Sequence, residues 1–149
     1  MNKNLLILGA GGHGKVVKEI AEALGYTNIA FLDDNSAEAI GKIADSKAFV
    51  NQFQEAFVGI GNNKFRGELL TRLEQEGFII PVITHPTAYV SKSAVIGKGT
   101  VVEPMAIVNA NSKIDTGCIV SVGSIVDHDV VLEDCVHVNA RLLYIAFPT

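Results

Sequence analysis

The sequence predicts two fold classes in one chain: a small parallel α/β domain followed by a parallel β-helix. Two observations carry this prediction. A glycine-rich turn joins a strand to a helix near the start of the chain, and an aliphatic residue returns at every sixth position through the second half. The chain has 149 residues, of which 48% are hydrophobic, so it can bury the cores of one or two small domains.

Strands and helices alternate in the first half of the chain. Asn4–Leu8 is a continuous apolar run, typical of a strand that is buried on both faces. Apolar patterns later in this half predict a helix at 15–24, strands at 28–32 and 55–60, a helix at 66–76 and a short strand at 78–80. Residues 45–54 show only a weak pattern. This alternation predicts a parallel α/β sheet.

The glycine-rich turn follows the first strand. Gly9, Gly11 and Gly14 match the G-x-G-x-x-G pattern in its required place between a strand and a helix. Without Cβ atoms the backbone can turn sharply and approach a phosphate, and a helix N-terminus offers N–H groups to the anion. We therefore expect phosphate contacts from Gly11, Gly12, His13 and Gly14; a tight turn that binds nothing is the alternative.

Two later turns follow predicted strands at their carboxyl ends, where open α/β sheets bind ligands. Asp33 and Asp34 follow the second strand and are candidates to hold a ribose or uridine hydroxyl, or else are solvated turn residues. Gly59, Gly61 and Asn62 follow the third strand and are expected to form a second wall of the same pocket.

Prolines mark the domain boundary. Pro81 and the pair His85-Pro86 interrupt the α/β pattern, and a proline biases its predecessor away from a helix. We expect three segments: a first domain at 1–80, an extended connector at 81–88 and a second domain at 89–149.

The six-residue repeat defines the second domain. Its aliphatic positions are Val90, Ile96, Val102, Val108, Ile114, Val120, Val126, Leu132 and Val138. Small side chains follow the first six of them at a distance of four residues: Ala94, Thr100, Ala106, Ser112, Cys118 and Ser124. A period of six fits neither an α-helix nor a long alternating strand, but it fits short strands separated by turns. Three such units make one triangular coil, and stacked coils enclose a thin apolar core.

Charge and cysteine content argue against several classes of function. The formal net charge is -4 and the sequence contains no basic run, so we expect no nucleic-acid partner. No apolar stretch approaches the length of a membrane span and the N-terminus lacks a signal-peptide pattern, so we expect a cytoplasmic protein. Cys118 and Cys135 form no C-x-x-C pair; we interpret them as buried small side chains, with a metal or disulfide role as the alternative, and we expect no metal cofactor.

The order of the motifs resembles one family. The series Gly9–Val17, Asp33-Asp34, Gly59–Asn62, His85-Pro86 and then hexads that carry Val126–Asp129 is similar to the sialic acid O-acetyltransferase and nucleotide-sugar N-acetyltransferase family of hexapeptide-repeat acyltransferases. The resemblance covers residues 3 to 140 and rests on the combination, because the repeat or the glycine motif alone is less specific.

The resemblance implies a Rossmann-like domain that binds the nucleotide sugar and a left-handed β-helix that binds acetyl-CoA. It also implies a homotrimer with active sites in the clefts between neighbouring prisms. In such relatives the histidine that matches His128 is the general base, and Asp129 raises its basicity. His137 matches a histidine near the thioester, and Ser121 stands where relatives often have an asparagine, so both are expected at the acetyl-CoA site.

The chemistry supports His128 independently of the resemblance. Acyl transfer to an amine or a hydroxyl requires the loss of a proton as the nucleophile attacks the thioester carbon. An imidazole with a pKa near neutral suits that step, and an adjacent carboxylate stabilises its charged form. His128 stands two residues after the inward Val126, so it is expected to point outward.

The repeat is short. The tail Arg141–Thr149 resembles neither a hexad nor a polar cap, which predicts a C-terminally shortened β-helix of about three coils, about 14 Å tall. Much of the expected CoA surface is then missing, so we expect weak CoA binding and little or no transfer. The apolar tail residues are expected to cover the open end as a plug or to form an exposed patch; they are Leu142, Leu143, Tyr144, Ile145 and Phe147.

Three functional hypotheses follow. The first is an acetyl-CoA-dependent acetyltransferase that acts on a nucleotide-linked amino sugar or a sialic acid. The second is a shortened family member that binds nucleotide sugar or assembles without transfer; the missing coils favour it and the intact Asp127-His128-Asp129 opposes it. The third is a nicotinamide-dependent oxidoreductase, which is disfavoured because the first domain is too short for a second mononucleotide-binding half.

Overall fold

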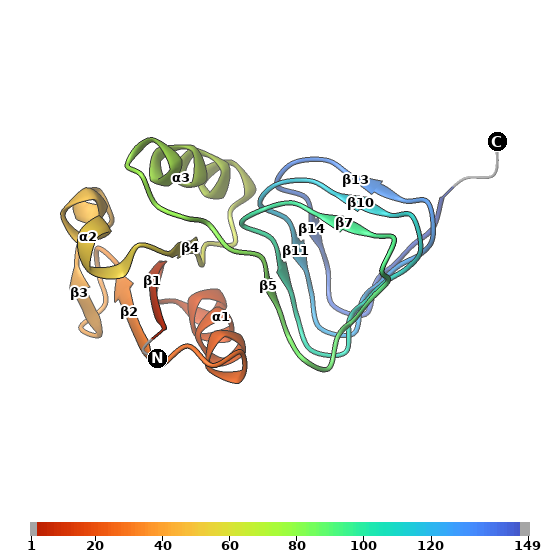
Figure 1. Ribbon diagram of the computed structural model, residues 1–149, viewed down its shortest axis with the longest axis horizontal. Helices are drawn as coiled ribbons and strands as arrows, with labels where there is room; N and C mark the ends of the chain where they lie inside the picture. Colours follow the sequence, from red (N-terminus) through yellow and green to blue (C-terminus); the bar gives the residue numbers. More distant parts are fainter. Residues whose placement is uncertain (1–2, 147–149) are drawn as a thin grey trace. The chain divides into compact units, whose positions relative to one another are not determined.

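The chain divides into two compact units at Pro81–Val82, and the computed structural model describes residues 3–146. Figure 1 shows a first unit of helices packed around a sheet and a second unit of short strands wound into stacked triangular coils. Each unit has an apolar core of its own.

The first unit is built on a four-stranded parallel sheet in the order β3-β2-β1-β4. Its strands are β1 (Asn4–Leu8), β2 (Asn28–Leu32), β3 (Ala39–Gly41) and β4 (Ala56–Val58). β1 pairs with β2 on one edge, with Leu6 opposite Ala30, and with β4 on the other edge. β1 is therefore a central strand, as its apolar sequence predicts.

Helices cover both faces of this sheet (Figure 1). They are α1 (Gly12–Ala23), the 3₁₀ helix η1 (Ile43–Phe49), α2 (Val50–Phe53) and α3 (Asn63–Gln75). Leu6 and Leu8 of β1 pack in a cluster with the leucines of α3, whereas Leu5 and Ile7 are buried on the opposite face, where α1 contacts β1. Burying one such side chain contributes about 1.5–3 kcal/mol, so β1 is the main stabilising strand of the unit.

Both long helices begin three residues earlier than predicted. α1 begins at Gly12 because Gly11 takes the extended conformation of an N-cap and the residues after it adopt helical torsions. α3 begins at Asn63 because the side chain of Asn62 accepts a hydrogen bond from the N–H of Phe65 at 2.9 Å. Capping thus extends each helix into a segment that looks like a loop in the sequence.

The edges of the sheet differ more from the prediction. The strand expected at 78–80 is reduced to an isolated bridge between Glu55 and Ile79, close to Pro81, which has no N–H for a further ladder bond. The edge strand β3 has no counterpart in the prediction, because three residues are too few to show an alternation. Residues 45–53 of the weak segment lie within η1 and α2, and Gln54 follows α2.

The second unit is a parallel β-helix with two-residue strands. They are β5 (Ile83–Thr84), β6 (Tyr89–Val90), β7 (Val95–Ile96), β8 (Val101–Val102), β9 (Ile107–Val108), β10 (Lys113–Ile114), β11 (Ile119–Val120), β12 (Ile125–Val126), β13 (Val131–Leu132), β14 (His137–Val138) and β15 (Leu143–Tyr144). They form three sheets, ordered β13-β10-β7, β14-β11-β8-β5 and β15-β12-β9-β6. Each strand pairs with the strand eighteen residues along the chain, so one coil takes three hexads, as the period predicts.

The hexad residues fill the core of the β-helix. The nine predicted aliphatic side chains, from Val90 to Val138, all belong to or pack against its apolar cluster, which confirms their inward direction. The small side chains lie at the corners, and buried hydroxyls there are satisfied by the backbone, as where Ser112 Oγ donates to the carbonyl oxygen of Asp127 at 2.6 Å. Such bonds avoid the cost of a buried polar group without a partner.

A left-handed turn residue recurs in successive hexads. The backbone φ is positive at Gly99, Met105, Asn111, Gly117, Gly123, Asp129, Cys135 and Arg141. The N–H of such a residue donates to a carbonyl of the preceding coil, as from Asp129 to Ala110 at 2.9 Å. A side chain at positive φ costs about 1–2 kcal/mol, least for Asn and Asp. The repeat therefore holds Asp129 in a conformation that its own residue type tolerates.

Both ends of the β-helix extend beyond the predicted hexads. β5 pairs with β8, so the first coil begins at Ile83, inside the segment expected to be a connector. At the other end Leu143 and Tyr144 form β15, which pairs with β12, so the prediction that the repeat ends after Ala140 is wrong. Tyr144 takes the inward position of an aliphatic residue and packs against the core as a half-buried side chain.

The part of the apolar tail that the structure describes, up to residue 146, favours the exposed patch over the plug. Leu142, Leu143 and Ile145 are exposed side chains, as in the alternative of an exposed patch, and Phe147 lies outside the described residues. Leu143 points outward because it is the first residue of a two-residue strand whose second residue, Tyr144, points inward.

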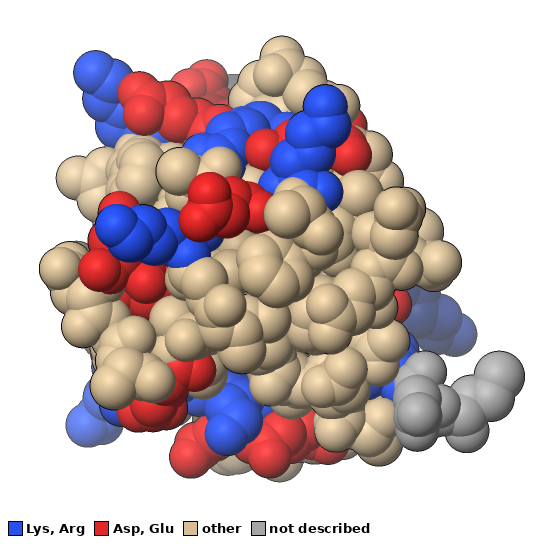
Figure 2. Space-filling view, turned by 90° about the vertical axis from the view of Figure 1, so that its left-hand side faces the viewer, with Lys and Arg blue, Asp and Glu red and all other residues tan. Residues whose placement is uncertain are grey.

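The sequence predicts neither a basic surface nor a membrane span, and it leaves a disulfide between the two cysteines as an alternative. On the face seen in Figure 2, basic and acidic side chains lie interspersed without a basic patch. No helix within residues 3–146 is long and apolar enough to cross a membrane. Cys118 is buried in the β-helix core, where its Sγ donates to the carbonyl oxygen of Glu133 at 3.1 Å, whereas Cys135 is a half-buried turn residue; neither is in a disulfide.

Candidate functional site

The glycine-rich loop connects β1 to α1 at the carboxyl edge of the sheet. The N–H of Gly9 donates to the carbonyl of Leu32, and the N–H of Ala10 donates to Asp33 Oδ2, both at 2.8 Å. The loop is therefore tied to the end of β2. No side chain caps α1 at Gly11, and the first N–H groups of a helix have no acceptor within it. A partial positive charge gathers at such an end and favours an anion.

The glycines of this region have two different tasks. A Cβ on Gly14 would lie 1.9 Å from the carbonyl oxygen of Gly9, and one on Gly59 would lie 2.7 Å from Gly14 Cα. Gly14 and Gly59 are therefore required for the close packing of loop, helix and strand. A Cβ on Gly11 or Gly12 would meet no atom within 4 Å. Of the glycines that are predicted to contact phosphate, Gly11 and Gly12 have open space through which a ligand can reach the backbone.

Asp33 and Asp34 hold the backbone around the loop. Asp33 accepts hydrogen bonds from three backbone N–H groups. These bonds lower the pKa of Asp33, and the bond from Ala10 has the largest effect. Asp34 Oδ1 accepts from the N–H of Ile43 at 3.1 Å. The two carboxylates thus have a structural task that the sequence does not reveal, in addition to the hydroxyl-binding role predicted for them.

The turn after β4 carries the predicted second wall. A Cβ on Gly61 would meet no atom within 4 Å, whereas Asn62 uses its Oδ1 as the cap of α3. Sequence reasoning misses Arg66, which is 1% exposed and donates to the carbonyls of Ile60 and Gly61 at 3.1 Å and to Asn63 Oδ1 at 2.8 Å. Arg66 lies on the face of α3 that carries the buried leucines. This position in the sequence could have indicated an arginine that points inward and holds the turn in place.

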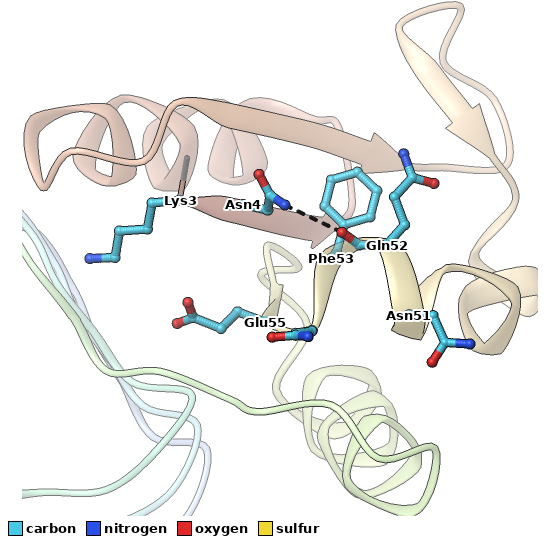
Figure 3. Close-up of a pocket in the computed structure, with 7 residues that line it drawn as sticks. Lys3, Asn4, Asn51, Gln52, Phe53 and Glu55 are labelled. Carbon is cyan, nitrogen blue, oxygen red and sulfur yellow. Dashed lines mark hydrogen bonds between the residues drawn. The ribbon is translucent and has the colours of Figure 1, made fainter. Parts of the chain in front are cut away.

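A polar hollow of about 370 Å³ lies elsewhere in the first unit (Figure 3). Lys3, Asn4 and Glu55 line it, and Asn4 Nδ2 donates to the carbonyl oxygen of Gln52 at 3.3 Å. These residues stand at the amino ends of β1 and β4, opposite to the edge that carries the glycine-rich loop. Open α/β sheets bind ligands at the carboxyl ends of their strands, so we assign no ligand to this hollow.

In the second unit, His128 stands in the turn after β12. Its side chain is 63% exposed, as expected for an outward residue, and Nδ1 lies 2.7 Å from Asp129 Oδ2. If Nδ1 donates to this carboxylate, the lone pair of the neutral ring is on Nε2. The hydrogen bond with Asp129, and after it the charge of Asp127, raises the pKa of His128. The structure thus pairs the predicted base with its predicted acidic neighbour.

Asp127 and Asn109 support this turn and are absent from the predicted site. Asp127 Oδ1 accepts from the N–H of His128 at 2.7 Å and from Asn109 Nδ2 at 3.0 Å, and these two bonds lower the pKa of Asp127. Asn109 stands eighteen residues before Asp127, at the same corner of the neighbouring coil. That spacing in polar residues is the sequence signal that could have identified the pair.

His137 and Ser121 lie together, but not beside His128. Ser121 Oγ is 2.9 Å from His137 Nε2, and these residues belong to or follow the paired strands β14 and β11. His128 follows β12, which belongs to a different sheet. Nine residues separate the two histidines, which is half of the eighteen-residue coil, so they lie on different sides of one prism.

Sequence comparison relates the chain to sugar acetyltransferases. Residues 4–73 match the family model described as the PglD N-terminal domain. Over 113 residues the chain is 38% identical to the UDP-N-acetylbacillosamine N-acetyltransferase of Bacillus subtilis (strain 168), and the match covers 67% of this chain and 51% of that protein. The chain thus spans about half the length of this curated relative.

Solved structures extend the likeness to both units. The acetyltransferase domain of PglB from Neisseria gonorrhoeae FA1090 is 42% identical with a TM-score of 0.87, over 91% of this chain and 70% of that chain. A histidine-to-asparagine mutant of perosamine N-acetyltransferase from Caulobacter crescentus, in complex with CoA and GDP-perosamine, is 32% identical with a TM-score of 0.86, over 90% and 67%. The fold is therefore a Rossmann-like α/β domain followed by a left-handed β-helix.

Proposed function

The chain belongs to the family of nucleotide-sugar acetyltransferases, and we propose that it transfers an acetyl group from acetyl-CoA to a nucleotide-linked amino sugar. The observation that carries the proposal is the pair His128–Asp129 at an exposed corner of the β-helix. The PglB domain has a structure in complex with acetyl coenzyme A, and the Caulobacter enzyme one with CoA and GDP-perosamine. The names of the latter and of the Bacillus relative favour an amine over the hydroxyl of a sialic acid as the acceptor.

The glycine-rich loop is the proposed site of the nucleotide sugar. Open space beside Gly11 and Gly12 and the N-terminus of α1 suit the phosphates. Gly61, which also has open space, is proposed to line the second wall, and Asp34 is proposed to contact a hydroxyl through its carboxylate. His13, half-buried in the first turn of α1, completes the set. Gly14, Gly59, Asp33 and Asn62 support these groups through the packing and hydrogen bonds described above.

His128 is the proposed general base. Its Nε2 accepts the proton that the sugar amine loses while the amine nitrogen bonds to the thioester carbon. Asp129 holds Nδ1–H and stabilises the imidazolium that results. The tetrahedral intermediate then breaks its carbon–sulfur bond, and the CoA thiolate takes the proton from the imidazolium. The products are the acetylated sugar and the CoA thiol.

The acetyl-CoA site is proposed to lie between subunits. His137 and Ser121, the predicted acetyl-CoA contacts, are half a coil away from His128, so one prism cannot place all three at one thioester. A neighbouring copy can supply the missing side, and closed rings of identical copies are the usual outcome of such head-to-tail contacts. The outward side chains of the β15-β12-β9-β6 sheet offer an apolar contact face; they are Tyr89, Ile107, Ile125 and Leu143. We therefore propose a homotrimer that assembles through its β-helices.

Mixing two defective variants tests this assembly. His128→Ala and His137→Ala proteins, unfolded together and refolded in equal amounts, are expected to regain about a quarter of the wild-type activity, because one site in four then joins an intact His128 to an intact His137. Light scattering after size-exclusion chromatography should give the mass of a trimer. A stable monomer, or a mixture no more active than its parts, would refute the shared site.

Asp129→Asn is expected to move the acidic limb of the pH profile of kcat/KM to lower pH. The base acts only when neutral, so the rate rises as the pH passes the pKa of His128, which the Asp129 hydrogen bond raises. An amide carries no charge and lowers that pKa again. Asparagine tolerates the positive φ of residue 129, so the turn should persist. An unmoved limb in both kcat/KM and kcat would exclude Asp129 from this role.

Mass spectrometry of the products tests the proposed function. The protein is incubated with acetyl-CoA and a panel of UDP- and GDP-linked amino sugars, with the corresponding sugars that lack the amine as controls. Acetylation of an amine-bearing member is expected. Binding without any product would favour the shortened, non-transferring alternative, and reduction of NAD would favour the oxidoreductase, which the family assignment opposes.

A cytoplasmic location is part of the proposal, because both substrates are cytoplasmic metabolites.

A further inference from the structure

The turn that carries His128 is connected to the preceding coil by a side-chain amide. Asn109 follows β9 as Asp127 follows the paired strand β12, so the two residues occupy the same corner of neighbouring coils. Asn109 Nδ2 donates to Asp127 Oδ1 at 3.0 Å, and the same oxygen accepts from the backbone N–H of His128 at 2.7 Å. One carboxylate oxygen therefore joins the side chain of Asn109 to the main chain of the proposed base.

The direction of the Asn109 amide is fixed by its own contacts. Its Oδ1 accepts from the N–H of Ala110 at 2.9 Å, so Nδ2 is the group directed to Asp127. With the amide turned over, the NH₂ group would face another N–H and the oxygen would face a carboxylate. The bond from the His128 N–H, and after it the bond from Asn109, lowers the pKa of Asp127, so this carboxylate is ionised at neutral pH.

Other bonds hold the path of the main chain through this turn. The N–H of Asp129 donates to the carbonyl oxygen of Ala110 at 2.9 Å, and Ser112 Oγ donates to the carbonyl oxygen of Asp127 at 2.6 Å. These bonds do not involve the side chain of Asn109, so the turn should persist without it. What depends on Asn109 is the orientation of the Asp127 carboxylate, which is the acceptor for the N–H of the next residue.

The ring of His128 depends on its backbone for its position. The side chain is 63% exposed, and its Nδ1 lies 2.7 Å from Asp129 Oδ2. The place of Nε2 is therefore set by this contact and by the main chain of residue 128. A displacement of about 1 Å at a catalytic group can cost about 10²-fold in rate, so a bond that orders this main chain bears on proton transfer.

We infer that Asn109 is a positioning residue of the proposed reaction: by fixing the Asp127 carboxylate it holds the backbone of His128, so that Nε2 stays in place for the amine proton. The inference rests on the proposed function for the identity of this step. Asn109 acts through Asp127 and takes no part in the proton transfer itself.

NMR of the free protein tests the hydrogen-bond chain without any substrate. With the aspartate carboxyl carbons labelled, an Asp127→Asn variant identifies the Asp127 signal. Asn109→Ala is expected to raise the pKa of Asp127, because one of the two hydrogen bonds that lower it is lost. Hydrogen exchange at the His128 amide should become about two- to tenfold faster, the range for weakening one hydrogen bond.

Ser91 provides the matched control for these measurements. It occupies the same corner one coil earlier, and its hydroxyl lies 3.1 Å from Ser93 Oγ, within its own turn. Ser91→Ala should therefore leave the Asp127 titration and the His128 amide as in the wild type. An unchanged Asp127 titration in Asn109→Ala, or an equal change in Ser91→Ala, would overturn the inference.

Steady-state kinetics tests the link to the reaction. Asn109→Ala is expected to lower kcat about three- to thirtyfold while KM for both substrates stays the same, because the contact orders the base and not the substrates. Ser91→Ala should keep the wild-type kcat. A normal kcat in Asn109→Ala, or a change in KM alone, would overturn the inference.

Asn109→Asp is a second variant of nearly the same shape. It places a carboxylate against the carboxylate of Asp127, and repulsion between like charges should move the acceptor away instead of only releasing it. We expect a larger loss of kcat than in Asn109→Ala, and a smaller loss would contradict the inference. Absence of transfer by the wild type would instead overturn the proposed function and would leave the NMR result as it stands.

Discussion

Replacing His128 with alanine is expected to lower kcat at least about 10²-fold, because a positioned general base contributes about 10²–10⁴-fold in rate. The affinity for the nucleotide sugar should change little, since the imidazole acts on the amine proton in the transition state and is 63% exposed at a corner of the β-helix. The fold should persist, because the Asp127 bond that orders the turn uses the backbone N–H of His128 and not its ring.

A second histidine provides the matched control. His85 lies in the first coil and its ring contacts Thr87 at 2.8 Å, within its own turn, so His85→Ala removes the same ring without touching the proposed site. Steady-state kinetics of both variants should show a large loss of kcat only for His128→Ala. Near-normal turnover without His128 would end its assignment as the base.

Gly11→Val is expected to weaken nucleotide-sugar binding about 10- to 100-fold, the range for losing one hydrogen bond to a charged group. Gly11 has a φ of -80° and a ψ of -162°, which any residue adopts, and open space where its Cβ would be. The valine should therefore leave the fold intact and occupy the space through which a phosphate approaches. Calorimetry with a nucleotide sugar measures the loss.

Two other substitutions serve as controls for Gly11→Val. Ala23→Val adds bulk at the exposed far end of the same helix and should bind normally. Gly14→Ala should instead destabilise the first unit, because its Cβ would lie 1.9 Å from the carbonyl oxygen of Gly9. Thermal unfolding followed by circular dichroism separates the two kinds of effect. Unchanged affinity of Gly11→Val would remove the loop from the ligand site.

The repeat shows how much of the fold is readable in the sequence. Inward residues such as Val102 and Val120 recur with a period of six, and that period alone predicts the coil and its core. The ends of the repeat are harder to predict from the sequence. Tyr144 breaks the aliphatic pattern although it takes an inward position, because a half-buried site tolerates an amphipathic ring. In the first unit, the short strand β3 depends on its pairing with β2, a contact between segments that no local pattern contains.

The candidate site was only partly predictable for a similar reason. The motif predicts His128, Asp129 and the glycines as site residues, but only the structure separates the open Gly11 from the packed Gly14. Supporting residues such as Asn109 are joined to the site by stacking of coils, so their relation to it is a spacing of eighteen and not a neighbouring position. A search for polar pairs at that spacing would find Asn109–Asp127.

Release of the CoA thiol shows directly whether this chain transfers acetyl groups with His128 as the base. The assay compares the wild type with His128→Ala at saturating acetyl-CoA, with and without the nucleotide-linked amino sugar that binds best. We expect thiol release by the wild type that depends on the sugar and falls at least about 10²-fold in the variant. Release that does not need the sugar, equal release by both proteins, or none by the wild type would contradict it.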